Sequence, residues 1–232
     1  MKNEIVTISA LAAMIMVSCS SFASNTVETQ TRNVQNFNAI DVAQGINVNI
    51  DFGDAESAIV EANPEYIDDV VTEVKSGTLY IYLKNKTKIR KMTCTVNVTA
   101  MQIDAINASS GSQVNSKCIK NNNVKLNASS GATINAEMKA EKTSLKTTSG
   151  STIRVNGSAD VADVVLNSGS TIDASSLCAK NMDINVSSGA SAYINVKDSL
   201  QAEASSGASI RYFGNPHYRV INKSSGGSVS QR

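Results

Sequence analysis

The residues best suited to acid–base chemistry in this chain are one aspartate and two arginines. Asp173 lies 19 residues after Arg154 (173 − 154) and 38 residues before Arg211 (211 − 173), at equivalent places in a sequence repeat. Enzymes that cleave polysaccharides need several acids and bases on one face. A single carboxylate between cations is more typical of a surface ion pair, so the pattern predicts no catalytic site.

Other groups that could do chemistry lack partners in the sequence. The one histidine, His217, follows Pro216 in a connecting segment, and no histidine accompanies the many serines as a base. No Cys/His spacing predicts zinc, and no acidic repeat predicts calcium. We therefore expect no catalytic residue, cofactor or metal. The net charge of +1 does not suggest a nucleic-acid partner.

A phrase of about 19 residues occurs seven times and organises the chain. It is a small polar run that ends in Ser-Gly, followed by a small residue and an aliphatic one. Successive glycines are 20, 19, 19, 20, 18 and 19 residues apart (131 − 111, 150 − 131, 169 − 150, 189 − 169, 207 − 189, 226 − 207). A fixed period of this length is typical of a solenoid. The pairs are Ser110-Gly111, Ser130-Gly131, Ser149-Gly150, Ser168-Gly169, Ser188-Gly189, Ser206-Gly207 and Ser225-Gly226.

The columns of the repeat indicate β-strands. With each glycine as position 0, positions −5, −3 and +3 are mostly aliphatic, and positions −4, +2 and +4 are mostly polar. Alternation at period two is a strand signal, so each phrase predicts one coil of a β-solenoid, with coils about 4.8 Å apart. We expect Ile134, Ile153 and Ile172 to stack inside. Position +3 reads Val114, Ile134, Ile153, Ile172, Ala192, Ile210 and Val229.

The invariant serine at position −1 has odd parity, so the same alternation predicts that it points inward beside the glycine. We expect a tight corner there, because glycine accepts backbone conformations that other residues resist. A buried hydroxyl without a partner is costly, so this serine ladder should be hydrogen-bonded. A flexible Ser/Gly linker is the alternative, but linkers do not keep aliphatic columns in phase over seven copies.

Residues 1–23 are typical of an export signal. Lys2 supplies the positive start, and an apolar segment follows that is too short for a membrane span. Two cleavage sites remain open. One is a signal-peptidase site after Ala23, and the other is a lipobox ending at Cys19, which would make Cys19 a lipidated N-terminus.

The segment before the repeats predicts short strands and one helix. Residues 24–36 should be a flexible lead, and alternation predicts strands within 37–42, 45–52, 57–62, 78–83 and 92–100. Asn63 can cap a helix that starts at Pro64, so a helix is expected over residues 64–73. The basic run from Lys84 to Lys91 is either a solvated edge or a surface for an anionic partner.

Three cysteines lie beyond the export signal. Cys118 and Cys178 are 60 residues apart (178 − 118), or about three coils, which exceeds the reach of a disulfide at roughly 14 Å. We expect free and mostly buried thiols. A bridge between Cys94 and Cys118 is the alternative.

Gly45-Ile46-Asn47, within the run from Ile40 to Val48, followed by the Ser-Ser-Gly repeats, resembles the head GIN domain family of adhesins (DUF2807), which is common in Bacteroidetes. The resemblance covers roughly residues 37–230. It implies an all-β, single-stranded, right-handed parallel β-helix of the pectin-lyase kind, with about 20 residues per coil, over residues 37–232. It also implies no known catalytic residues and an adhesive role, but it transfers no ligand-contacting residue.

Three functions are compatible with these observations. The first is a non-catalytic exported module whose Ser, Thr and Asn face, with Tyr193 and Tyr212, binds a glycan or a protein at the cell surface or in the periplasm. The second is a carbohydrate-active enzyme that uses Asp173. The third is a structural envelope protein that self-associates, because no capping helix follows Gly226. A lipid anchor is the only membrane contact expected. Asp198-Ser199-Leu200 resembles an O-glycosylation triplet of Bacteroidetes.

Overall fold

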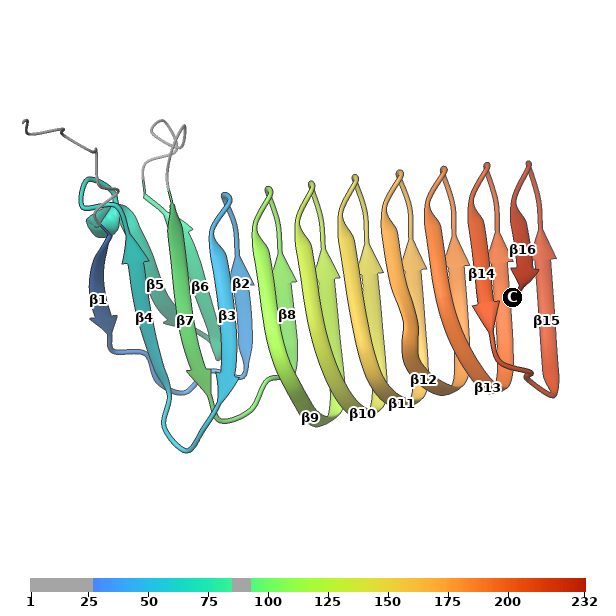
Figure 1. Cartoon of the computed structure of the whole chain (residues 1–232), viewed down its shortest axis with the longest axis horizontal. Coiled ribbons are helices and arrows are strands. Elements are labelled where there is room, and N and C mark those ends of the chain that lie inside the picture. The colour runs from blue at the N-terminus through green and yellow to red at the C-terminus, as the bar shows by residue number, and fades with distance from the viewer. Residues whose placement is uncertain (1–26, 85–92) are drawn as a thin grey trace, which may run out of the picture.

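The protein is a rod-shaped β-solenoid (Figure 1). The computed structural model describes residues 27–84 and 93–232. Its strands join in one sheet of 16 strands that winds around a narrow aliphatic core. The strands are β1 (Glu28–Arg32), β2 (Ala39–Val42), β3 (Asn47–Phe52), β4 (Ser57–Ala62), β5 (Val70–Lys75), β6 (Thr78–Leu83), β7 (Cys94–Ala100), β8 (Ala105–Ala108), β9 (Gln113–Ala128), β10 (Thr133–Thr147), β11 (Thr152–Leu166), β12 (Thr171–Val186), β13 (Ser191–Ala204), β14 (Ser209–Phe213), β15 (Tyr218–Lys223) and β16 (Ser228–Gln231).

The predicted stacking of coils is confirmed. Ile134 pairs with Ile153, and Ile153 pairs with Ile172, in parallel register, and all three side chains are fully buried. Long strands such as β9 bend once, so the single sheet folds into two halves and the coils contribute to both. We call the sheet that follows each Ser-Gly corner the front sheet, which begins with β1, β4, β7 and β3. The back sheet precedes each corner and begins with β5, β6, β2 and β8.

The Ser-Gly corners are present, but the inward orientation predicted for the serine is wrong. All seven serines at position −1 are exposed, with φ between 46° and 56°, and the glycines after them also have positive φ. The Ser112 N–H donates to the Ser109 carbonyl at 3.1 Å, which closes a four-residue turn of the type I′ class. Two left-handed residues reverse the chain so sharply that the inward position passes to +1.

Buried hydroxyls do occupy that +1 position, and they are hydrogen-bonded. Ser112 Oγ donates to the Ser109 carbonyl at 2.8 Å, and Ser151 Oγ donates to the Thr148 carbonyl at 2.8 Å. Each bond spans the turn from inside. The buried serine that hydrogen-bonds across the corner is therefore the residue after the glycine. Alanine takes this position in several other coils.

Gly45-Ile46-Asn47 forms the first corner of the solenoid. Gln44 and Gly45 have φ of 65° and 74°, as in the Ser-Gly turns, and the Gly45 N–H donates to the Ser110 carbonyl at 3.0 Å. Ile46 is fully buried at the +1 position. The motif is thus a rung of the ladder, separated from the next corner by an insertion.

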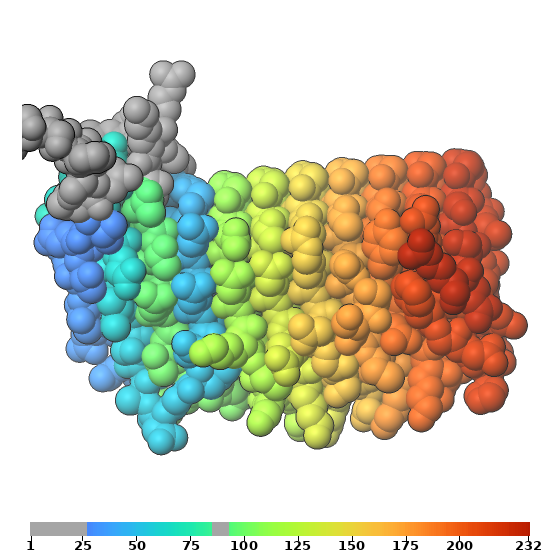
Figure 2. Space-filling view, viewed as in Figure 1, coloured from blue at the N-terminus to red at the C-terminus, as the bar shows by residue number. Residues whose placement is uncertain are grey.

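That insertion builds the N-terminal end. After β3 the chain runs outward through β4, turns back through β5, and returns through β6 and β7, which pair in parallel with β2 and β3. Strands β4 and β5 are antiparallel to β7 and β6, and β1 pairs with β4 as the outermost strand of the front sheet. Figure 2 shows the consequence, because the green β7 surface lies between cyan and blue strands of earlier sequence. The flexible lead expected for residues 24–36 is wrong for β1.

The helix expected over residues 64–73 is also wrong. Its first turn survives as a 3-10 segment, Ile67–Asp69, in which the Asp69 N–H donates to the Tyr66 carbonyl at 2.9 Å. The rest is β5. The β-branched residues of Val70–Lys75 favour a strand, and the Ser76-Gly77 turn, with positive φ at both residues, folds β5 onto β6.

The C-terminal end consists of β15 and β16, which nothing in the described chain covers. Val229 continues the aliphatic column into this last coil, but other inward positions are polar: Arg219 and Gln231 stand where the preceding coil carries Leu200 and Tyr212. The Arg219 guanidinium donates to Tyr212 Oη at 3.4 Å and to Gln231 Oε1 at 3.3 Å. Gln231 Nε2 donates to the Gly214 carbonyl at 2.8 Å. These bonds close the end of the core with polar groups.

The remaining expectations concern the thiols and the segments that the structure does not describe. Cys94, Cys118 and Cys178 are free, so the alternative Cys94–Cys118 bridge is wrong. Cys94 is buried but Cys178 is exposed, so the thiols are not mostly buried. The predicted export signal with Cys19, and the basic run apart from Lys84, lie outside the described residues. No helix in residues 27–84 and 93–232 is long and apolar enough to cross a membrane.

Candidate functional site

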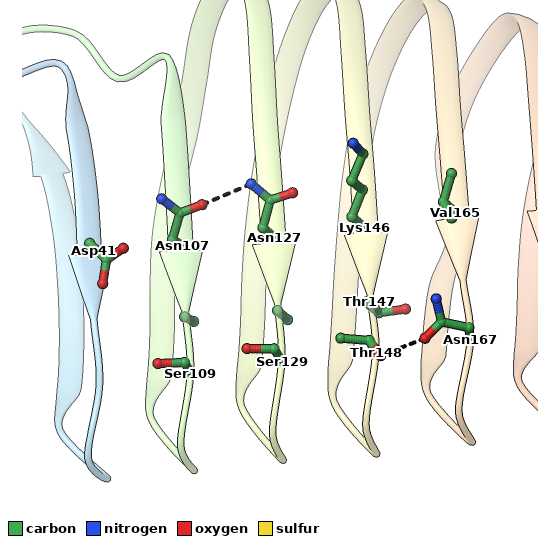
Figure 3. A pocket seen from close by; sticks show the side chains of 12 residues that line it. Asp41, Asn107, Ser109, Asn127, Ser129, Lys146, Thr147, Thr148, Val165 and Asn167 are labelled. Carbon is green, nitrogen blue, oxygen red and sulfur yellow. Dashed lines mark hydrogen bonds between the residues drawn. The ribbon is translucent and has the colours of Figure 1, made fainter.

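A groove of about 390 Å³ crosses the back sheet between two ladders of outward side chains. Figure 3 shows both ladders, each contributing one residue per coil along the rod. The sequence folds this way because parallel, in-register coils place equal repeat positions about 4.8 Å apart. The −4 ladder is Asp41, Asn107, Asn127, Lys146 and Val165, and the −2 ladder is Ser109, Ser129, Thr148 and Asn167.

Hydrogen bonds between coils orient the −4 ladder. Asn127 Nδ2 donates to Asn107 Oδ1 at 2.8 Å, and the Asn107 side chain is near enough to the Asp41 carboxyl group to lower its pKa. Burial raises the pKa of Asp41, and the Asn107 side chain partly offsets that effect. The amides therefore form a directed chain that ends on a carboxylate.

The −2 ladder supplies hydroxyls on the other side of the groove. Thr148 Oγ1 donates to Asn167 Oδ1 across neighbouring coils, while the hydroxyls of Ser129 and Ser109 face the groove without a side-chain partner. Buried alanines, Ala108 and Ala128, line the groove between the two ladders. Because these alanines turn toward the core, they leave a narrow floor flanked by amide and hydroxyl groups.

This arrangement suits binding better than acid–base catalysis. Asp41 and Lys146 are three strand steps apart, or roughly 14 Å, whereas paired carboxyl groups of glycosidases lie about 5–9.5 Å apart. Their charges also compensate. The groove thus presents neutral donors and acceptors at a regular spacing, which matches a long ligand rich in hydroxyl groups.

The front-face residues considered first for catalysis do not form the expected ion pair. Asp173 Oδ1 accepts hydrogen bonds from Ser175 Oγ at 2.6 Å and from the Ser175 N–H at 3.2 Å. The ion pairs of the described chain do not include Asp173. Arg211 instead lies 5.6 Å from the ring centre of Tyr193. This neighbourhood therefore holds a single carboxylate, and Ser175, two residues further along the chain, already donates hydrogen bonds to it.

The structure also shows where the other positions singled out in the sequence lie. The corner residues and Gly45-Ile46-Asn47 shape the edge of the rod, and Tyr212 is buried rather than displayed on the polar face. His217 is exposed. Ser199 of the suspected glycosylation triplet is half-buried in β13, between paired strands, and its modification stays a prediction.

Sequence reasoning missed Asp41 as part of the groove. It lies 66 residues before Asn107 (107 − 41), beyond the insertion that builds the N-terminal end, so the 19-residue period does not reach it. The signal was nevertheless present. Aligning Gly45 with the repeat glycines places Asp41 at position −4, in the column of Asn107 and Asn127.

Comparison with known proteins agrees with this architecture. A family model described as "Putative auto-transporter adhesin, head GIN domain" matches residues 36–216. No curated protein matches the chain. A Bacteroides fragilis structure described as a "putative adhesin" is 17% identical, with a TM-score of 0.84, covering 90% of this chain and 98% of the other.

Two further solved structures show the same fold at similar distance. A "putative adhesin" from Parabacteroides merdae has a TM-score of 0.72 and 18% identity, covering 90% of this chain and 97% of the other. A "putative lipid binding protein" from Parabacteroides distasonis has a TM-score of 0.71 and 17% identity, covering 90% and 98%.

Proposed function

The chain belongs to the head GIN domain family, and on that premise we propose that it is an exported, non-catalytic adhesion module that binds a neutral glycan in the back groove. The family description and the printed names of two similar structures support adhesion as the general role. The export signal of residues 1–23 supports a place at the outer membrane, the cell surface or the periplasm, and Cys19 is the proposed lipid anchor.

The observation that carries the proposal is the spacing of the groove's polar groups. Amide and hydroxyl side chains recur about every 4.8 Å along the rod. An extended peptide places side chains of one face roughly 6.6 Å apart, because its rise is about 3.3 Å per residue. An extended β-1,4-linked glycan advances by about one strand spacing per sugar, so each coil meets one sugar. Successive sugars are flipped, but both faces of the chain carry hydroxyl groups, so every coil still meets a hydroxyl. A glycan therefore fits better than a protein strand.

The test is binding of defined oligosaccharides to the exported chain. The probes are cellohexaose, mannohexaose, xylohexaose and chitohexaose, with maltohexaose as a curved α-linked control. Asn107→Ala/Asn127→Ala should weaken binding at least about tenfold, since two ladder amides lose their bonds to the ligand. The matched control is Asn185→Ala, in the same column beyond the groove.

Two outcomes would contradict the proposal. One is that no β-1,4-linked hexaose binds, and the other is that the double variant binds as tightly as the original chain. Mass analysis of the bound hexaose after incubation tests the enzyme alternative at the same time. Intact oligosaccharide is expected. Shortened products that disappear with Asp173→Ala would instead support the alternative that the chain is a carbohydrate-active enzyme.

A further inference from the structure

A second amide ladder runs along the front sheet. Asn135 Nδ2 donates to Asn115 Oδ1 at 2.9 Å, and Asn115 Nδ2 donates to Asn49 Oδ1 at 3.1 Å. Asn49 Nδ2 then donates to Asn97 Oδ1 at 2.9 Å, and Asn97 Nδ2 donates to Glu61 Oε1 at 3.0 Å. As on the back sheet, every amide donates toward the N-terminal end and the chain of bonds ends on a carboxylate.

Tandem repetition does not account for this ladder. Asn115 and Asn135 belong to the 19-residue phrase, but Asn97 lies in β7 and Glu61 in the antiparallel strand β4, both inside the insertion. Asn97 extends the asparagine column into a strand with unrelated local sequence, and Glu61 reaches Asn97 diagonally from beside Ile59, the residue opposite it. Outward polar pairs add only about 0.2–1 kcal/mol each to sheet stability. Stability alone is therefore a weak reason for four aligned asparagines on an exposed surface.

The bonds within the ladder leave each amide partly unused. A side-chain amide has two N–H donors and two acceptor lone pairs. Asn49 spends one donor and one lone pair on its neighbours, so one of each remains for a ligand. Asn115 spends one donor on Asn49, and its Oδ1 accepts from both Asn135 and Gln113 Nε2, so Asn115 keeps one donor for a ligand. Because the neighbours already fix the side-chain orientation, a ligand would not have to order these groups.

These free groups line a groove of about 510 Å³ on the front sheet. Its second wall is the +6 column, in which Lys117 Nζ lies 2.7 Å from Asp51 Oδ1, so that these two charges compensate. The same column also contributes Glu137, which is in none of the ion pairs of the described residues, so the groove shares the regular spacing of the back groove and carries one further acid. It adjoins the Asp173 neighbourhood further along the same face, with which it shares Asn135 and Asn156.

The two grooves open in opposite directions. Strands β2 and β3 flank one corner and turn their aliphatic residues toward a common core, so Asp41 and Asn49 point away from each other. We propose that the front groove is a second binding site, for a neutral β-1,4-linked glycan chain lying along the rod axis, so that one molecule bridges two chains. This inference rests on the proposed glycan-binding function.

The first measurement is stoichiometry by titration calorimetry with whichever hexaose of the panel binds. Two hexaoses per rod are expected for the original chain, and one for Asn49→Ala/Asn115→Ala. The control is Ser230→Ala, which occupies the same column in the last coil and should keep two. Asn135→Ala removes only the last bond of the ladder and serves if the double variant fails to fold.

The second measurement is agglutination of beads coated with the same glycan by protein that light scattering shows to be monomeric. The original chain should cross-link beads, and the front-groove variant should bind them without cross-linking. One hexaose per rod, unchanged by the front-groove substitutions, would overturn the second site and leave the back groove intact. Absence of binding by every hexaose would overturn both proposals.

Discussion

The two ends of the rod finish the same core in different ways. One aliphatic column runs from Val60 in β4 through Val96 and Val48 to Val229 in β16. Val60 is fully buried because β1 pairs across it, whereas Val229, in the last coil, is 8% exposed. The N-terminal end is covered by added strands. The C-terminal end is closed only by its own polar side chains.

The charges of the ends differ as well. Residues 54–75 contain seven acids and one cation, whereas residues 209–232 contain four cations and no acid. At the C-terminal end, Arg219 and Lys223 occupy inward positions of the repeat. Inward charges protect a sheet edge from pairing with another chain, because pairing would bury them. A solenoid can thus end with added strands that cover its edge, or with inward charges that make pairing at the edge costly. The inward charges at the C-terminal end oppose self-association there.

Thiol reactivity should show the largest difference between a covered and an open region. Burial in β7 raises the pKa of Cys94 to about 11, and its side chain is 1% exposed, whereas Cys178 is exposed. At pH 8 only about one Cys94 thiol in a thousand would be ionised. Because Cys94 is also buried, alkylation followed by peptide mass analysis should label Cys178 at least about a hundredfold faster.

Labelling in denaturant is the control for that comparison, and both thiols should then react at similar rates. Comparable rates in the native state would mean that β4 and β1 do not cover β7.

Matched valine substitutions should show the next largest difference. Val96→Ala removes two fully buried methyl groups and should lower the free energy of unfolding by about 2 kcal/mol, at roughly 0.8 kcal/mol per group plus a cavity term. Val229→Ala in the same column should cost less than about 1 kcal/mol, because one side of its coil is open. Urea denaturation measures both. Equal losses of unfolding free energy would show that the polar side chains at the C-terminal end pack the last coil as well as β1 and β4 pack the N-terminal end.

The strands and the inward columns could be predicted from the sequence because alternation and period act locally and repeat. Stacking of Ile134 on Ile153 follows from two copies of one phrase. The serine at position −1 could not be placed by parity, because two left-handed residues reset the alternation within a single turn. Reading parity across a turn assumes extended backbone on both sides, and that assumption fails at every corner.

The N-terminal end was the part that local signals could not resolve. Asn63 and Pro64 are good helix-start residues, yet pairing of β5 with β6 overrides them after one turn. Strand β1 shows no apolar alternation, since its role is to cover β4 with backbone bonds. The groove residues were partly visible as an Asn column, but Asp41 needed the register that only the folded insertion supplies.

Matched glycine substitutions test whether strain at a corner is felt equally at both ends. Gly45 and Gly226 have φ of 74° and 78°, a region that costs an L-residue about 1–2 kcal/mol. Gly45→Ala should lower global stability by that amount because β2 and β3 carry the first coil. Gly226→Ala should instead fray β15 and β16, with a smaller change in the urea midpoint and faster hydrogen exchange confined to residues 218–231. Equal midpoint shifts would mean that the last coil unfolds together with the rest.

The smallest expected effect compares position −4 in the first and last coils. Burial raises the pKa of Asp41, so the folded state favours the protonated form, and stability is lost as pH rises through the folded pKa. Asp41→Asn should therefore stabilise the rod at pH 7, by about 0.2–1 kcal/mol for a continued amide ladder, and this gain should vanish below about pH 4. Asn222→Asp, in the exposed β15, should change stability by less than about 0.5 kcal/mol at either pH. Thermal melts at pH 7 and pH 3.5 measure both. If the gain from Asp41→Asn persists at pH 3.5, the gain comes from packing and not from removal of the charge. The Asp41 carboxylate would then destabilise the first coil no more than an exposed carboxylate destabilises the last coil.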